Sequence, residues 1–149
     1  FSGWGSFNQG LSHFPGAAEG GDGFGSSLTA GDFHNDGADD LVIGISSEDI
    51  GSIQKAGMVQ ILNGIPGTGL TALGVQNLHQ DASGVGGVCE KNDLFGFAIC
   101  AGDFDGDGLE DLVVGVPGED ITDANQGMIQ TFHVEDSSKL EYWKGWTQN

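Results

Sequence analysis

The chain repeats itself at a fixed spacing of 71 residues, and this repeat constrains the fold more than any other feature of the sequence. Phe24 and Phe95, each followed by glycine, open the two copies and lie 71 residues apart (95 − 24). Residues 9–50 and 80–121 align without a gap and share 20 identities in 42 positions. A repeat of this kind indicates structural units that stack side by side, each covering a face of its neighbour.

Short runs of β-forming residues recur at the same places in both repeats. The runs span residues 26–30, 41–45 and 58–62, with a weaker one at 75–78, and residues 97–101, 112–116 and 128–132 in the second repeat. The runs at 41–45 and 112–116 are apolar at consecutive positions instead of alternating, which predicts strands covered on both faces. The sequence therefore predicts an all-β fold of small antiparallel four-stranded sheets.

An acidic loop of nine residues follows the first run of the second repeat. Its oxygen donors are Asp103, Asp105, Asp107 and Asp111 at loop positions 1, 3, 5 and 9, with the carbonyl of Leu109 at position 7. Ca²⁺ takes about 6 to 8 oxygen ligands, and carboxylates at alternate positions converge when the chain curls around one point. Without a cation, these carboxylates would repel one another. The loop is therefore predicted to bind Ca²⁺.

The corresponding loop of the first repeat departs from this pattern at position 3. Its candidate ligands are Asp32, His34, Asp36 and Asp40, with the carbonyl of Ala38. Imidazole is a poor ligand for a hard, oxygen-seeking cation. We therefore expect weaker Ca²⁺ binding at this loop, and we expect the His34 side chain to point to solvent.

Charge and composition exclude several classes of function. The formal net charge is −18, with four lysines and no arginine, so nothing is available to displace counterions from nucleic-acid phosphates. No apolar run approaches the roughly 20 residues of a membrane span, so no membrane insertion is expected. His13, His79 and His133 lack a serine or cysteine partner context, and we predict that the protein is not an enzyme.

The repeats resemble a known family. After Phe-Gly, both contain Gly-Asp-Phe-x-x-Asp-Gly-x-x-Asp-Leu-Val-x-Gly, which is similar to the FG-GAP repeat of integrin α-subunit β-propellers and of many extracellular microbial proteins. Pro117 lies close to the position of the family's Ala-Pro, whereas Ser46 has replaced that proline in the first repeat. The resemblance implies two four-stranded antiparallel propeller blades, Ca²⁺ in the loop between the first two strands, and a secreted or cell-surface protein.

Two blades alone would leave two apolar faces in water, because known propellers close with about 4 to 8 blades. On this basis, residues 1–10 form an outer-strand segment that completes a neighbouring blade, and residues 11–79 form blade 1. Residues 80–149 form blade 2 together with the start of the next outer strand. We expect the partners to be further copies of the chain or the remaining blades of a longer propeller.

The two cysteines of the chain both lie in the second repeat. Cys89 and Cys100 stand where the first repeat has Ala18 and Thr29. Their joint occurrence favours a disulfide ahead of the strand that follows Phe95, in agreement with an oxidising compartment. The alternative is a pair of buried free thiols.

Two other segments look like functional motifs but are expected to be structural. Glu48 and Glu119 recur after the second strand of each repeat, where we expect hydrogen-bonded turn residues and no second ion site. Residues 67–72 mimic a dinucleotide-binding fingerprint, yet the second repeat has no glycine there and no helical pattern follows. We therefore expect residues 67–72 to form a connecting loop.

The sequence leaves three functional interpretations open. The favoured one is a non-enzymatic extracellular module for adhesion or for binding a protein or glycan ligand. A carbohydrate-binding propeller lectin is the second, and exposed aromatic residues such as Trp4, Tyr142 or Trp143 near carboxylates would support it. The third is an accessory propeller domain of a secreted hydrolase. Loop shape, and not the repeat motif, sets the ligand of a propeller.

Overall fold

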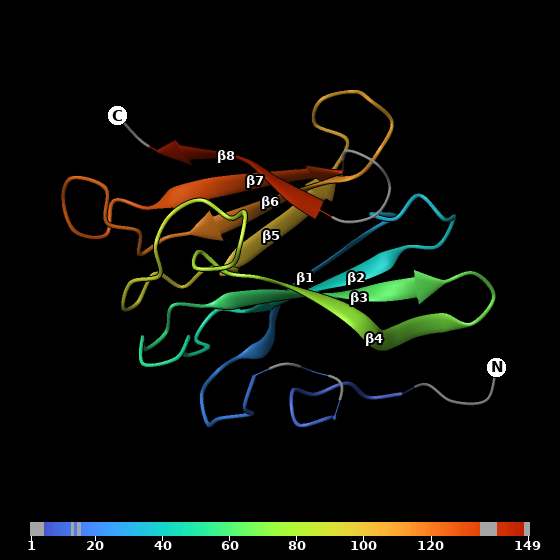
Figure 1. The fold of residues 1–149 in the computed structure, drawn as a ribbon, viewed down its shortest axis with the longest axis horizontal. Helices are drawn as coiled ribbons and strands as arrows, with labels where there is room; N and C mark the ends of the chain where they lie inside the picture. Colours follow the sequence, from blue (N-terminus) through green and yellow to red (C-terminus); the bar gives the residue numbers. More distant parts are fainter. Residues whose placement is uncertain (1–4, 13, 15, 135–139, 148–149) are drawn as a thin grey trace.

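The computed structural model describes residues 5–12, 14, 16–134 and 140–147, which form two four-stranded antiparallel sheets (Figure 1). The first sheet contains β1 (Phe24–Gly31), β2 (Asp40–Ile45), β3 (Met58–Ile65) and β4 (Gly69–Leu78). The second contains β5 (Ala98–Gly102), β6 (Asp111–Val116), β7 (Met128–Val134) and β8 (Leu140–Thr147). Strand order follows the chain in both sheets, which confirms the predicted all-β fold of two four-stranded blades. No helix in the described ranges is long and apolar enough to cross a membrane.

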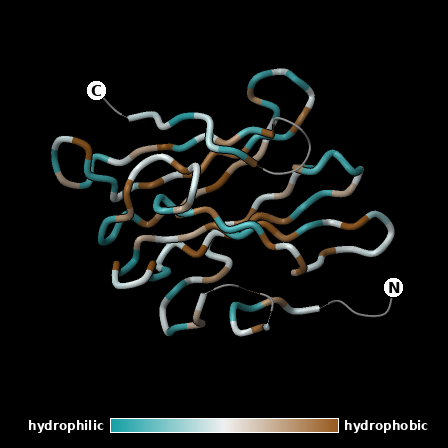
Figure 2. Tube along the Cα trace, viewed as in Figure 1, coloured by the Kyte–Doolittle hydropathy of each residue, from teal (hydrophilic) through white to brown (hydrophobic). Residues whose placement is uncertain are grey.

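The two blades pack face to face, with β1 next to β5 and the main hydrophobic core between them. In Figure 2 the hydrophobic stretches of both sheets lie in the middle of the molecule, and the connecting loops are more hydrophilic. Completely or almost completely buried core residues are Val42, Val59 and Ile61 of blade 1 and Leu112, Val114 and Phe132 of blade 2. A second cluster, with Phe14, Ile43 and Ile45, covers the other face of blade 1. Strand β2 is therefore covered on both faces, as its uninterrupted apolar run predicts.

The Phe95–Gly96 turn of blade 2 rests directly on the backbone of blade 1. A Cβ atom on Gly57 would lie 2.3 Å from the Phe95 carbonyl oxygen, and one on Gly44 would lie 2.4 Å from the Gly96 carbonyl oxygen. The Phe95 N–H donates a hydrogen bond of 2.9 Å to the carbonyl of Ala56. Glycine is therefore required at both positions of blade 1, because a side chain would separate the two sheets.

A matched pair of glycines tests this contact. Gly57 and its counterpart Gly127 both have positive φ, 86° and 78°, so alanine adds about 1–2 kcal/mol of left-handed strain at either site. The atom nearest to a Cβ on Gly127 is the Pro117 carbonyl oxygen at 3.3 Å, a tight contact that a shift of a few tenths of an ångström relieves. Because Gly57→Ala must also displace the Phe95 backbone, we expect it to lower the free energy of unfolding by about 1–3 kcal/mol more than Gly127→Ala. Urea denaturation measures this difference. Equal losses of unfolding free energy in the two variants would show that Gly57 does not contact the Phe95 backbone closely.

Strand β4 is longer than the sequence predicts. Residues 69–72, expected to lie in a connecting loop, belong to this strand, and Ile65 pairs with Gly69 across a tight turn. The Thr68 N–H donates to the Ile65 carbonyl at 2.9 Å, which closes the hairpin. Residues 5–10 contain no strand and residues 1–4 lie outside the described ranges, so the assignment of residues 1–10 to a neighbouring blade stays a prediction.

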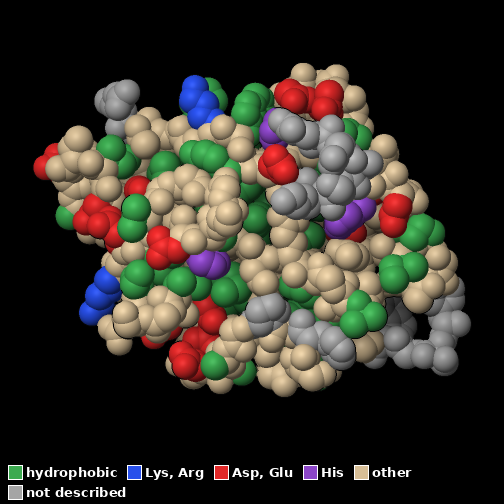
Figure 3. All heavy atoms as spheres, viewed as in Figure 1, with side chains coloured by type: hydrophobic (Ala, Val, Ile, Leu, Met, Phe, Trp, Pro, Cys, Tyr) green, Lys and Arg blue, Asp and Glu red, His purple; other side chains and the backbone are tan. Residues whose placement is uncertain are grey.

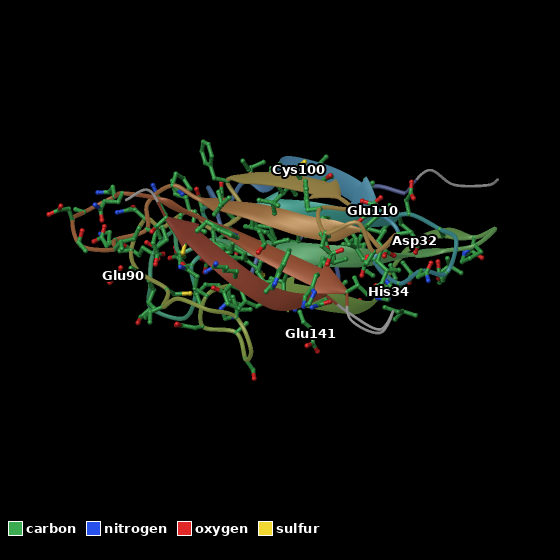
Figure 4. All side chains as sticks on the ribbon, turned by 90° about the horizontal axis from the view of Figure 1, so that it is seen from above. Asp32, His34, Glu90, Cys100, Glu110 and Glu141 are labelled. Carbon is green, nitrogen blue, oxygen red and sulfur yellow. The ribbon has the colours of Figure 1, made fainter. Side chains whose placement is uncertain are left out.

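The expected disulfide is wrong, because Cys89 and Cys100 are both free thiols. Cys89 is buried in the loop before β5, with its N–H bound to Asp81 Oδ1 at 3.0 Å and its Sγ 3.9 Å from His79 Nδ1. Burial raises the pKa of the Cys89 thiol. Cys100 is exposed on β5, away from Glu90, which neighbours Cys89 at one end of the sheets (Figure 4). The two side chains thus belong to different parts of blade 2.

Candidate metal centre

The acidic loop of blade 2 joins β5 to β6 and curls around the carboxylate of Asp103. Asp103 Oδ1 accepts the Gly106 N–H at 2.7 Å, and Oδ2 accepts the Gly108 N–H at 3.0 Å. Both glycines have positive φ, 82° and 90°, a conformation that glycine adopts without steric cost. The first aspartate of the motif therefore organises the loop backbone, and the glycines permit its curvature.

Three carboxylates of this loop converge on one point. One oxygen from each of Asp103, Asp105 and Asp111 lies within 4.8 Å of the others. Asp111, at the start of β6, is 2% exposed, while Asp103 and Asp105 face solvent. Burial raises the pKa of Asp111; the hydrogen bond from the Phe104 N–H lowers it, and the neighbouring charges of Asp105 and Asp107 raise it. A cation at this point would offset both the burial and the repulsion.

The donor set fits Ca²⁺, because it consists of carboxylate oxygens on a loop that is open to solvent. Asp107 is a predicted ligand that lies outside the converging group; its Oδ1 accepts the Leu109 N–H at 2.8 Å. The Leu109 side chain packs against the core, which anchors the loop. The structure thus brings together three of the four predicted carboxylates, and it places Asp107 and Leu109 on the same curled loop.

The loop of blade 1, between β1 and β2, has a similar but not identical hydrogen-bond frame. The Asp32 carboxylate accepts the N–H groups of Asp36 and Gly37 at 3.0 and 2.8 Å. Asp36 Oδ1 in turn accepts the Ala38 N–H at 3.0 Å. Asn35 has a φ of 50° at the position that Gly106 occupies in blade 2. The two loops therefore share part of their geometry: the bond from Gly37 matches that from Gly108, whereas the second bond to the first aspartate comes from Asp36 in blade 1 and from Gly106 in blade 2.

In blade 1 the His34 ring contacts the carboxylate of Asp40. Its Nδ1 lies 2.7 Å from Asp40 Oδ2, and its side chain is 24% exposed, so the expectation that His34 points to solvent is wrong. Asp40 also accepts the Phe33 N–H at 3.0 Å through Oδ2 and the Gly64 N–H at 2.7 Å through Oδ1. A cation in this loop would have to displace His34 from Asp40. Among the described residues, the carboxylates of this loop form no converging group like that of blade 2.

Both acidic loops lie at the same end of the stacked sheets. In Figure 4, Asp32 and His34 of one loop and Glu110 of the other are gathered at this end, and Glu90 lies at the opposite end. A Cβ on Gly31 would lie 3.3 Å from the Glu110 Cβ, so the loops are in direct contact. On the face of the molecule shown in Figure 3, acidic side chains are more abundant than basic ones. This end of the molecule therefore favours cations and disfavours anionic surfaces.

A second repeated polar arrangement lies at the other end of each sheet, and the sequence analysis missed it. Gln9 Nε2 donates to Glu48 Oε2 at 2.6 Å, and Gln80 Nε2 donates to Glu119 Oε2. All four residues are buried, and burial raises the pKa of both glutamates. The glutamates are hydrogen-bonded turn residues, as expected. Their partners could have been found from the identity of Gln9 and Gln80 at equivalent repeat positions.

The aromatic residues considered as sugar platforms have different environments. Tyr142 packs against Phe132, with ring centroids 5.8 Å apart, and belongs to the edge of the core. Trp143 is 46% exposed and stacks on His133 at a centroid distance of 5.6 Å. Trp4 lies outside the described residues. Of these three aromatic residues, Trp143 offers the largest exposed ring in the described part of the chain.

Comparison with known proteins agrees with this geometry. A family model described as FG-GAP repeat matches residues 24–62 and 95–132, together just over half of the chain. Over 94 residues, which are 63% of the chain, the sequence is 35% identical to integrin alpha-5 of Xenopus laevis. The match spans only 7% of that protein's length. Each range matched by the family model runs from the Phe-Gly turn through the acidic loop into the third strand of a sheet.

Proposed function

Because the chain belongs to the FG-GAP repeat family, we propose that it forms two blades of an extracellular, integrin α-like β-propeller that binds Ca²⁺ in its blade hairpins. The convergence of Asp103, Asp105 and Asp111 is the observation that carries this proposal. In this proposal residues 11–79 and 80–149 are the two blades, and residues 1–10 complete a neighbouring one. The module is not an enzyme, and it presents its loops to a protein or glycan ligand in adhesion or recognition.

The bound Ca²⁺ would be held in blade 2 by Asp103, Asp105, Asp107 and Asp111 and by the carbonyl of Leu109. In blade 1 the corresponding residues are Asp32, His34, Asp36 and Asp40 with the carbonyl of Ala38. Ca²⁺ supplies positive charge that removes the repulsion between the aspartates. Because this site does not exist in the unfolded chain, its binding free energy adds to the free energy of folding.

A calcium titration with reciprocal variants tests this proposal. Extracellular modules bind Ca²⁺ with dissociation constants of about 10⁻⁴ to 10⁻³ M, and affinity follows the number of charged ligands. Because the loop of blade 1 is expected to bind more weakly, we expect isothermal titration calorimetry of the chelator-treated protein to give one ion per chain at Ca²⁺ concentrations that fill the site of blade 2. Asp105→Asn should weaken this site by about 10-fold or more, and His34→Asp, which supplies the missing carboxylate, should raise the stoichiometry to two.

Glu110→Gln is the matched control, because it removes a negative charge next to Asp111 from a residue that the motif does not use. It should leave the affinity within about 2-fold of the wild-type value, since the Glu110 side chain is only partly buried and its charge is screened by solvent. A thermal melt gives a second readout: Ca²⁺ at about 100 times the dissociation constant should raise stability by about 2.7 kcal/mol. Unchanged binding in Asp105→Asn, or one ion in both wild type and His34→Asp, would contradict the assignment of the ligands.

A further inference from the structure

The outer face of blade 2, turned away from blade 1, exposes apolar side chains whose repeat counterparts are buried. Phe104 and Ile129 are 53% and 45% exposed, whereas their counterparts Phe33 and Val59 in blade 1 are 1% and 0% exposed. The counterparts are buried because blade 2 covers them. Nothing in the described part of the chain covers the equivalent face of blade 2.

This face contains an apolar groove of about 350 Å³, whose lining includes Phe97, Gly115, Gly127, Ile129 and Trp146 and no charged residue. Gly115 and Gly127 are the counterparts of the two glycines in blade 1 that hold the Phe95–Gly96 turn. Gly127 also repeats the positive φ of its counterpart. We name this groove, defined by the five residues above, the seat of blade 2.

The matching turn is present on the opposite face of the molecule, in blade 1. The Phe24–Gly25 turn repeats the Phe95–Gly96 turn, with φ of 83° at Gly25 and 84° at Gly96. Each turn is closed by the same kind of hydrogen bond. The Ser26 N–H donates to the Gly23 carbonyl at 2.8 Å, and the Phe97 N–H donates to the Leu94 carbonyl at 3.0 Å. Leu28, four residues after Phe24, is 59% exposed. Its counterpart Ile99 packs against the core between the blades.

We propose that the seat of blade 2 binds the Phe24–Gly25 turn of a second copy of this chain. The contact would repeat, between molecules, the interface that the two blades already make within one molecule. Such a head-to-tail contact uses two different surfaces, so it builds a ring if the rotation closes and an open stack if it does not. This inference rests on the proposed propeller architecture and is independent of Ca²⁺ binding.

Two substitutions between the repeats make the contact between molecules weaker than the one within the chain. In blade 1, Ser27 Oγ donates to the Gly96 carbonyl at 2.6 Å, and Thr29 Oγ1 accepts the Ala101 N–H at 3.2 Å. Blade 2 has Ala98 and Cys100 at these positions. The seat of blade 2 therefore lacks a hydroxyl donor and a hydroxyl acceptor. We expect reversible association with a dissociation constant between about 1 µM and 1 mM.

Sedimentation velocity over this concentration range tests the proposal. Wild-type protein should associate, and more strongly at high salt, because chains of net charge −18 repel one another when unscreened. The Leu28→Lys variant should remain monomeric, because it places a charge on the surface of the Phe24–Gly25 turn. The Ile129→Lys variant should also remain monomeric, because it places a charge in the seat of blade 2. An equimolar mixture of these variants retains one intact surface of each kind, so it should form 1:1 complexes and nothing larger. Leu73→Lys, at an exposed leucine on strand β4, is the control and should associate like wild type.

A variant that strengthens association gives a test whose result misfolding cannot explain. Ala98→Ser restores the hydroxyl that donates to the Phe-Gly turn in blade 1, and should tighten association by about 2- to 10-fold. A monomeric wild type at every concentration and salt would overturn the proposal and leave the seat to another partner. Association that survives Leu28→Lys would also overturn it, because it would show seat-to-seat pairing. Repeating the series with a chelator separates this result from a failure of Ca²⁺ binding.

Discussion

Replacement of Phe95 by alanine is expected to lower the free energy of unfolding by about 3–5 kcal/mol, the usual cost of truncating a fully buried phenylalanine. The Phe95 ring is 0% exposed between the two blades, and it meets the Phe132 ring edge to face at a centroid distance of 6.4 Å. Because the Phe95 backbone contacts Gly57 directly, the sheets have little room to close the cavity that the ring leaves. Urea denaturation followed by circular dichroism measures the loss.

The repeat supplies the control for this prediction. Phe24 occupies the same position in blade 1 and packs edge to face on Phe14 at 5.5 Å, yet it is only partly buried. Phe24→Ala should therefore cost clearly less than Phe95→Ala when both are measured on dilute, monomeric protein. If the two losses were equal, the interface between the blades would not be the main source of stability.

Replacement of Asp40 by alanine is expected to destabilise the protein by about 2–6 kcal/mol even when no Ca²⁺ is present. Asp40 is 1% exposed, and it accepts hydrogen bonds from the N–H groups of Phe33 and Gly64, both buried. Each buried donor left without an acceptor costs about 1–3 kcal/mol, and the substitution leaves two N–H groups without an acceptor. Denaturation in excess chelator isolates this loss from any contribution of bound metal.

Asp36→Ala is the matched variant in the same loop. Asp36 is exposed and accepts only a local hydrogen bond from the Ala38 N–H, so its loss should cost less than about 1 kcal/mol in chelator. If Asp40→Ala lowered the free energy of unfolding only when Ca²⁺ was present, Asp40 would be chiefly a metal ligand. The expected result, a loss of stability in chelator, would instead show that Asp40 is a structural residue. Both of its carboxylate oxygens already accept hydrogen bonds, so it has little ability to coordinate a cation.

The repeat made most of the fold predictable from sequence, because equivalent residues have equivalent structural tasks in both copies. The consecutive apolar residues of β2 correctly indicated a strand covered on both faces, whereas the same pattern in β6 was wrong for one face, on which Val113 and Gly115 stay partly exposed. Strand β4 was partly mistaken for a loop because Gly69 and Gly74 interrupt its pattern, and an edge strand needs fewer apolar residues. The acidic loops were located by the spacing of their aspartates, and the structure brings Asp103, Asp105 and Asp111 together.

The remaining features depend on contacts that spacing does not encode. His34 could be placed in its loop, but its orientation depends on the Oδ2 oxygen of Asp40, six residues away. The two cysteines occur together in one repeat, yet Cys100 stands on the exposed face of β5 while Cys89 is buried before it. The Gln9–Glu48 pair joins residues 39 positions apart, and only the arrangement of the turns brings them into contact.

The direct contact between Gly57 and Phe95 has a consequence for how such an architecture can change over time. At Gly57, main-chain atoms of blade 1 lie against main-chain atoms of blade 2, and main-chain atoms are common to every amino acid. Aliphatic residues of the core can then be exchanged for others of similar volume without moving this contact. Glycine at such positions therefore determines how closely two neighbouring sheets approach each other, while the aliphatic residues around the contact can vary.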